Sequence, residues 1–248
     1  MKRKLADRLK KVRDNIAAAA ARSGRSADQV KLVAVTKLVG VDVIRQLLEA
    51  GLSDIGENHV QELIKRAGMI QEYQSRLQFG GGRSVPAAHW HMVGHLQRNK
   101  VKPLLPWVSV IHSLDSLRLA EEISNQASRL QRTVDVLIQV NASGEKSKSG
   151  VAVAAVGHLA EQIVTLPCLN VLGLMTMAPL SDDPEKVRPV FVRVREIFEE
   201  MVASQALGRQ FRELSMGMSQ DYQVAVEEGA TMVRIGTALF QDAEPVPA

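Results

Sequence analysis

One lysine in this chain stands where amine chemistry is feasible, at the end of the first strongly apolar segment. Lys37 closes the segment VKLVAVTK of residues 30–37, which has the composition of a buried strand. An amine that emerges beside a buried strand can lose part of its hydration, which favours the neutral form that attacks a carbonyl carbon to give a Schiff base. An isolated lysine at such a place is more often an ordinary exposed strand end. Lys37 is therefore informative only if a carbonyl compound has a binding site nearby.

Two segments near the carboxyl end of the chain have the composition of an anion site. They read LSMGMS over residues 214–219 and VRIGT over residues 233–237. Glycine lets backbone N–H groups approach an anion, and the hydroxyl of Ser219 is suited either to a phosphate or to capping a helix over Gln220–Glu228. Arg234 lies inside a predicted strand, where its guanidinium needs a buried acid or a ligand atom as its partner.

The composition is that of a single globular protein of 248 residues, with 46% hydrophobic and 23% charged residues. The net charge of +4 is spread along the chain and only 4% of residues are aromatic, so we expect no nucleic-acid partner. One cysteine, Cys168, excludes an internal disulfide and favours a reducing, cytoplasmic location. Charged residues interrupt the first segment before it can resemble a signal peptide, and no apolar run is long enough to span a membrane.

Short apolar segments alternate with helical patterns along the chain. The predicted strands are Lys31–Thr36, Ser53–Gly56, His89–Gly94, Val108–His112, Val134–Val140, Asn170–Met175, Arg212–Ser215 and Met232–Ile235. The predicted helices are Lys4–Ala21, Val41–Ala50, Asn58–Ala67, Ser116–Leu130, Val151–Thr165, Pro184–Ala206 and Ser219–Glu228.

Eight strand and helix alternations in this length favour one α/β domain, a (β/α)8 TIM-type barrel over residues 30–240 with an extra N-terminal helix over residues 4–22. The single domain would comprise residues 1–248. An open doubly wound sheet is disfavoured because no G-x-G-x-x-G follows the first strand. The glycine run at residues 80–82 precedes the third strand and is interpreted as a loop on the structural face of the barrel.

Ligand sites in such barrels are built just past the carboxyl ends of the strands. The residues at these positions are nearly all polar: Lys37, Glu57 with Asn58, His95, Ser113, Asn141, Thr176, Ser215 and Gly236. His89, His91 and His95 do not have a convincing metal-ligand spacing, so we expect no metal site.

Several motifs in order give the chain a specific resemblance. They are VTK at 35–37, GEN at 56–58, HMVGHLQRNK at 91–100, KSG at 148–150, GLMTM at 173–177, LSMGMS at 214–219 and VRIGT at 233–237. With these motifs the chain closely resembles the pyridoxal phosphate homeostasis protein family, whose fold is similar to the N-terminal barrel domain of alanine racemase. The resemblance covers residues 30–240.

The resemblance implies a cofactor, pyridoxal 5′-phosphate (PLP), and a set of residues that bind it. Lys37 would hold PLP as a Schiff base, and Arg234 would face its pyridine nitrogen. Asn58 would line the ring. Ser219, Gly236 and Thr237 would engage the phosphate, and Ser215 and Met218 complete the expected cofactor-binding set.

Arg234 helps to separate a carrier from an enzyme. Carbanion chemistry on PLP profits from a protonated pyridine nitrogen, whereas an arginine can only donate to that nitrogen. Racemisation of the alanine racemase kind also needs a second base, which in that enzyme is a tyrosine from another domain. The only tyrosines of this sequence are Tyr73 and Tyr222, and neither is an obvious second base. We therefore expect no catalytic residues and a protein of intracellular PLP homeostasis that buffers PLP and delivers it to apoenzymes.

Other interpretations stay open at this point. An amino-acid racemase, or weak activity of that kind, is the main alternative, and a lysine aldolase without bound cofactor is a third. Lys148 is either a second amine or phosphate contact along the exit path, or a solvated loop charge. We expect a monomer, because no second domain follows the barrel.

Overall fold

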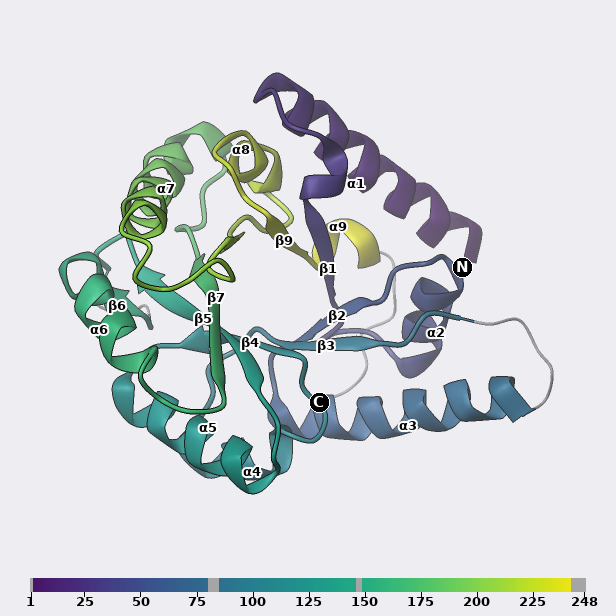
Figure 1. The fold of residues 1–248 in the computed structure, drawn as a ribbon. Helices are drawn as coiled ribbons and strands as arrows, with labels where there is room; N and C mark the ends of the chain where they lie inside the picture. Colours follow the sequence, from purple (N-terminus) through teal and green to yellow (C-terminus); the bar gives the residue numbers. More distant parts are fainter. Residues whose placement is uncertain (1, 80–84, 146–148, 242–248) are drawn as a thin grey trace.

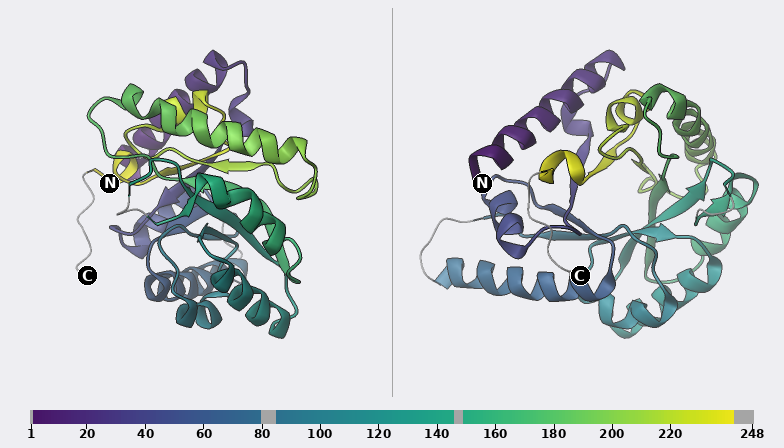
Figure 2. Two further views of the ribbon diagram at one scale, coloured as in Figure 1. Left: turned by 90° about the vertical axis from the view of Figure 1, so that its left-hand side faces the viewer. Right: turned by 180° about the vertical axis from the view of Figure 1, so that it is seen from behind.

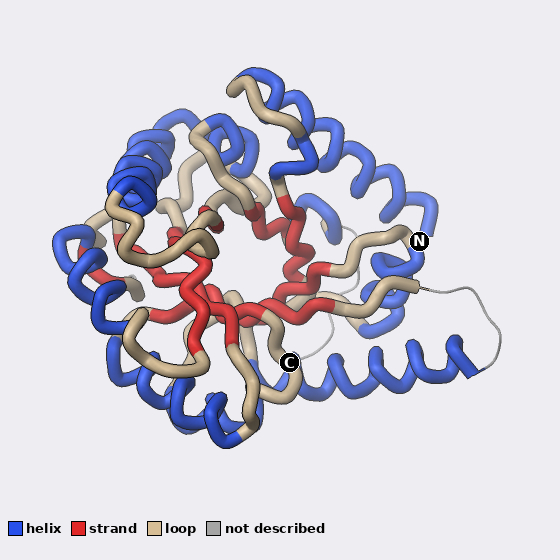
Figure 3. The backbone as a smooth tube through the Cα atoms, in the orientation of Figure 1, coloured by secondary structure: helices blue, strands red, loops and turns tan. Residues whose placement is uncertain are grey.

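The computed structural model describes residues 2–79, 85–145 and 149–241, and within them the chain forms a closed ring of parallel strands surrounded by helices (Figure 1, Figure 3). The strands are β1 (Lys31–Val35), β2 (Asp54–Glu57), β3 (His89–Met92), β4 (Val110–Leu114), β5 (Val134–Asn141), β6 (Val151–Ala152), β7 (Leu169–Thr176), β8 (Glu213–Ser215) and β9 (Met232–Ile235). The order in the sheet is β4-β3-β2-β1-β9-β8-β7-β5-β6, and a further pairing of β4 with β5 closes the barrel. The predicted α/β barrel is thereby confirmed.

Helices cover the outside of the ring. They are α1 (Lys2–Arg22), α2 (Val41–Glu49), α3 (Val60–Phe79), α4 (Val101–Leu104), α5 (Leu117–Arg129), α6 (Val156–Ile163), α7 (Arg188–Ala203), α8 (Tyr222–Glu227) and α9 (Thr237–Phe240). Single 3-10 turns lie at η1 (Ala27–Gln29), η2 (Arg98–Lys100), η3 (Val153–Ala155) and η4 (Pro184–Val187). The extra helix α1 packs against α8 and α9, outside the strands that begin and end the barrel (Figure 1, Figure 2).

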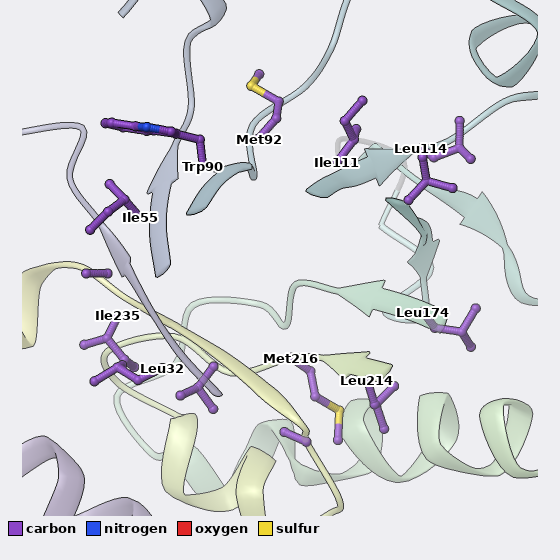
Figure 4. Packing of buried hydrophobic residues seen from close by; sticks show 14 of the residues in the cluster. Leu32, Ile55, Trp90, Met92, Ile111, Leu114, Leu174, Leu214, Met216 and Ile235 are labelled. Atoms are coloured by element: carbon purple, nitrogen blue, oxygen red, sulfur yellow. The ribbon is translucent and has the colours of Figure 1, made fainter. Parts of the chain in front are cut away.

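Alternate residues along each strand supply two apolar layers. The larger layer lies between strands and helices and includes Ile55, Ile111 and Leu174, which Figure 4 shows with other members of the cluster. A separate small cluster of Val110, Leu137, Met175 and Met232 comes from the opposite face of the same strands. Because side chains alternate across a strand, this second cluster fills the inside of the barrel, so the interior is a packed core.

The predicted strands agree with the eight barrel strands within two residues at each end, but several other predictions need correction. The segment predicted as a helix from Val151 begins instead with the two-residue strand β6, which pairs with the end of β5. Helix α3 runs to Phe79, twelve residues past the predicted end at Ala67. The short helices α4 and α9 are additional elements without a sufficient periodic pattern to predict them.

Two features considered from the sequence lie outside the described residues: the glycine run at 80–82 and Lys148. Within the described ranges, no helix has the length and apolar character that crossing a bilayer requires. In the same ranges, no group of three or more His, Cys, Asp or Glu side chains is placed to hold a metal ion.

Candidate functional site

Lys37 lies two residues beyond the end of β1, in the turn that leaves the barrel at the carboxyl ends of its strands. Its side chain is exposed, which corrects the expectation that the neighbouring strand partly buries the amine. An exposed amine at the mouth is open to a carbonyl compound from solvent. The residue before it is fully buried, so only the lysine itself projects from the strand end.

Thr36 fixes the backbone that carries Lys37. Its N–H donates to the carbonyl of Gly56 at 2.9 Å, and its hydroxyl contacts the same carbonyl at 3.3 Å. Its own carbonyl accepts from the N–H of Val39 at 3.0 Å and from the guanidinium of Arg66. Neighbouring strand, turn and helix therefore all bond to one residue, which determines where the lysine leaves the barrel.

Arg66 also forms a buried ion pair with Glu57, the last residue of β2. The two side chains are 5% and 0% exposed, and the guanidinium lies 2.7 Å from the carboxylate. Complete burial raises the pKa of Glu57 above its ordinary value, and the charge of Arg66 opposes that rise. The other carboxylate oxygen accepts from the N–H of Asn58 at 2.7 Å, so the pair holds the ends of β1 and β2 together.

Asn58 follows β2 at the mouth, where it is half-buried, and its position depends on a glycine in the next strand connection. A Cβ added to Gly94 would come within 2.3 Å of the carbonyl oxygen of Asn58 and 2.7 Å of its Cα. Only glycine permits this approach of two backbones. The backbone contact explains why the motif after β3 has a glycine where the β2 loop passes.

A pair of N–H groups converges on one oxygen at the far end of the chain. The backbone N–H groups of Gly236 and Ala238 each donate to the hydroxyl of Ser219 at 3.2 Å. Ser219 does not cap a helix from Gln220, because α8 begins only at Tyr222. Two converging donors are what an anion requires, and here a side-chain oxygen accepts from both.

The loop that carries Ser219 is held by its own backbone and by a buried carboxylate. Gly217 has φ of +92°, and its carbonyl accepts from the N–H of Arg234 at 3.0 Å. Asp221 accepts from the N–H of Met218 at 2.6 Å. Burial raises the pKa of Asp221, while that hydrogen bond and the charge of Arg234 act in the opposite direction. The loops after β8 and β9 are therefore locked together.

Arg234 is only 4% exposed and donates to two partners at the level of the mouth. One nitrogen bonds to the hydroxyl of Ser215 at 2.6 Å and another to the carbonyl of Thr176 at 2.8 Å. Among the described residues no carboxylate pairs directly with it, so the ion-pair alternative does not apply. Desolvation lowers the pKa of Arg234 to about 10, which leaves the guanidinium charged at neutral pH with N–H donors to spare.

The structure brings together most of the residues expected from the sequence, with different degrees of access. Gly236, Ser219 and Met218 are half-buried, and Thr237 is exposed beside them. Ser215 is fully buried, and its hydroxyl accepts a hydrogen bond from Arg234, which holds the arginine side chain in place. His95 lies 3.6 Å from Asp115 and is 57% exposed.

Sequence reasoning missed Arg66, although a signal was present. Leu63, Arg66, Ala67 and Ile70 share one face of α3 at helical spacing, and all four are buried. An arginine on an otherwise apolar helix face requires a buried partner, which is Glu57 in this protein. The hydroxyl of Ser113 is also buried and has no hydrogen-bond partner among the described residues.

Comparison with known proteins places this arrangement in a family. The family model for the alanine racemase N-terminal domain matches residues 8–244. A "Pyridoxal phosphate homeostasis protein" of Aquifex aeolicus is 42% identical over 234 residues, which cover 94% of this chain and 96% of the relative. This chain belongs to the pyridoxal phosphate homeostasis protein family.

Solved structures agree with that assignment. The structure of PipY from Synechococcus elongatus with PLP bound is 31% identical, with a TM-score of 0.78, and the match covers 95% of this chain and 99% of PipY. An alanine racemase of Clostridium difficile is 14% identical with a TM-score of 0.68, over 94% of this chain and 56% of the racemase. The second likeness concerns the fold alone, so the homeostasis family shares its barrel with a larger enzyme.

Removal of the charge on Arg66 tests the ion pair behind Lys37. In Arg66→Met, the buried carboxylate of Glu57 loses its partner, and we expect the free energy of unfolding to fall by about 3–5 kcal/mol. The measurement is denaturant unfolding of the single variant and of Glu57→Gln/Arg66→Met. The double variant should recover part of the loss, because it buries no unpaired charge. A double variant no more stable than Arg66→Met would contradict this account.

A pair of glycine substitutions tests the loop that carries Ser219. A Cβ on Gly217 would meet the Cβ of Ala225 at 2.6 Å and the Cα of Tyr222 at 2.9 Å, at a φ that disfavours other residues. We expect Gly217→Ala to cost at least about 2 kcal/mol of unfolding free energy in thermal or denaturant unfolding. Gly157 in α6 has open space around its added Cβ, so Gly157→Ala should stabilise by up to about 1 kcal/mol. Equal effects of both substitutions would refute the steric argument.

Proposed function

We propose that this protein binds pyridoxal 5′-phosphate at the mouth of the barrel and serves PLP homeostasis. PLP supplies an aldehyde that condenses reversibly with a primary amine, releasing one water molecule. Lys37 is the proposed attachment residue, because it is the exposed amine that the buried Thr36 holds at the mouth. The observation that carries the proposal is that an exposed amine, a pair of converging N–H donors and a charged arginine all lie at or near the carboxyl ends of the barrel strands.

The described residues fit the cofactor at both of its ends. The N–H groups of Gly236 and Ala238 already bond to an oxygen, that of Ser219, and a phosphate oxygen is an acceptor of the same kind. We propose that Ser219, Gly236 and Thr237 engage the phosphate, with Met218 beside them. Arg234 would donate one of its unused N–H groups to the ring nitrogen, held in place by Ser215.

We further propose that the protein has no strong catalytic activity of its own. Both tyrosines of the chain are engaged in the outer helices. The hydroxyl of the buried Tyr222 accepts from Asn15 of α1 at 2.8 Å, and the hydroxyl of Tyr73 bonds to Glu49 of α2 at 3.2 Å. Neither contact is at the barrel mouth, which supports a protein without the second base of a racemase. A permanently charged donor at the ring nitrogen also weakens the electron sink of the cofactor.

The proposed role is to buffer PLP and deliver it to apoenzymes. An exposed attachment lysine suits reversible loading, because water or another amine can reach the same carbon. We propose that the protein does this as a monomer in a reducing compartment. Transfer from the loaded protein to an apoenzyme, compared with an equal amount of free PLP, separates delivery from sequestration.

Replacement of the attachment lysine tests the binding proposal. We expect the protein incubated with PLP to form an adduct that borohydride reduces and that mass spectrometry maps to Lys37. Lys37→Ala should lose this adduct, because no amine remains at the end of β1. Lys65→Ala, on an exposed face of α3, is the matched control and should keep it. An adduct that persists unchanged in Lys37→Ala would overturn the proposal.

Two rival activities give different results with the same protein. Loss of optical purity from a single amino-acid enantiomer, abolished in Lys37→Ala, would identify a racemase. Borohydride trapping of a sugar-type carbonyl substrate without PLP would identify a lysine aldolase.

A further inference from the structure

A continuous chain of hydrogen bonds runs through the inside of the barrel from Arg234 to the opposite end of the strands. Arg234 contacts Ser215 at 2.6 Å, and the Ser215 hydroxyl contacts Nδ1 of His112 at 3.0 Å. Nε2 of His112 lies 2.9 Å from Nδ1 of His91, and Nε2 of His91 lies 3.0 Å from the carboxylate of Asp54. Asp54 begins β2, whereas Arg234 approaches the carboxyl end of β9, so the chain joins the two faces of the barrel.

The two end groups determine the direction of every bond in this chain. An ionised carboxylate can only accept, so Nε2 of His91 carries a proton and donates to Asp54. In a neutral imidazole the other nitrogen then accepts, which requires Nε2 of His112 to donate to Nδ1 of His91. By the same rule Nδ1 of His112 accepts from Ser215, and Ser215 accepts from Arg234. With both rings neutral, each histidine therefore carries its proton on Nε2.

The charges around the chain favour this protonation state. Complete burial lowers the pKa of His91, against the hydrogen bond and charge of Asp54, and the charges of Lys31 and His89 lower it further. Burial lowers the pKa of His112 well below its ordinary value, with the charges of His91, Arg234 and Lys31 acting in the same direction.

Asp54 itself stays ionised at the end of this hydrogen-bond chain. Burial alone would raise the pKa of Asp54, but the hydrogen bond and charge of His91 and the charges of Lys31 and His89 bring it below its ordinary value.

We infer that Asp54, His91 and His112 are positioning residues that act through Ser215 to hold the guanidinium of Arg234 at the cofactor site. The chain of hydrogen bonds couples Arg234 to a carboxylate on the far face of the barrel. It occupies the acceptor side of Ser215 with Arg234 and keeps the remaining N–H groups of the arginine free for a ligand. Only the identity of the atom that Arg234 meets rests on the proposed function.

Nuclear magnetic resonance of the ligand-free protein tests the direction of the chain. The ring nitrogen shifts of His91 and His112 should report neutral rings, protonated on Nε2, at pH 7. A proton on Nδ1 of His112, or a charged ring at either position, would overturn the inference. This measurement needs no cofactor, so failure of PLP to bind would leave its result valid and would count against the proposed function alone.

The pH dependence of unfolding gives a second measurement on the ligand-free protein. A histidine whose pKa is lowered by folding contributes stability above its unfolded pKa and loses that contribution as the pH falls toward its folded pKa. Below about pH 6.5, each such ring makes the unfolding equilibrium constant rise by up to roughly tenfold for every unit by which the pH falls. In His112→Asn this slope should decrease by up to one proton, whereas His158→Asn, an exposed residue of α6, should not change it. Equal slopes for the two variants would contradict the presence of a neutral, buried His112 in the hydrogen-bond chain.

The same variants test the positioning of Arg234 toward PLP. In His112→Asn the shorter side chain can still accept from Ser215 but cannot reach His91, so the chain is cut. We expect PLP to be released roughly tenfold faster, with an altered absorbance band of the bound cofactor, because Arg234 loses a fixed hydrogen-bond partner. His158→Asn should match the unchanged protein in both readouts. PLP attached normally at Lys37 with identical release from both variants would refute the positioning role while sparing the proposed function.

Discussion

The burial of one permanently charged guanidinium inside the barrel is the constraint on which the site depends. Arg234 cannot lose its charge at neutral pH, and no carboxylate touches it among the described residues. A buried charge must be hydrogen-bonded if the fold is to tolerate it. The hydroxyl of Ser215 and the carbonyl of Thr176 meet that need, and both come from strands beside β9 or close to it in the ring. The polar groups that surround Arg234 inside the barrel are thus required by one strand residue.

The two ends of the chain meet at this site because the barrel closes. β1 pairs with β9, which places the lysine after β1 next to the loop after β9. The ion pair of Glu57 and Arg66 fixes the first of these strand ends, and the interlocked loops after β8 and β9 fix the second. The residues that make these anchoring interactions are buried or half-buried, whereas Lys37 and Thr237 are exposed. That arrangement suits the proposed reversible binding of PLP.

Much of the fold was predictable from the sequence, because eight apolar segments alternate with helical patterns and parallel strands require such crossovers. From the sequence, the candidate site could be proposed at Lys37, Ser219, Arg234 and Gly236, since these residues follow or close recognisable strands and lie in specific motifs. The short strand β6 could not be predicted, because two residues carry no periodic signal. The end of α3 was missed because the residues after Ala67 are mostly polar and exposed, so packing gives them no pattern.

The chain from Arg234 to Asp54 was beyond sequence reasoning for a different reason. Its members lie on five strands, and each is an inward-facing residue with several possible partners in the same layer. Only the stagger of the closed barrel decides that His91 meets His112 at 2.9 Å. A sequence indicates which face a residue occupies, but the tilt of the strands determines which neighbour lies opposite.

The hydroxyl of Ser219 on the N–H groups of Gly236 and Ala238 has a consequence for how the site empties. If this is the proposed phosphate site, a departing phosphate would leave donors that have a tethered substitute within reach, so they would need neither solvent nor a rearranged backbone. Loading would then exchange one acceptor for another at a nearly constant number of hydrogen bonds. Such a site would bind its ligand less tightly and release it more readily, which suits a protein that stores a cofactor better than an enzyme that retains it.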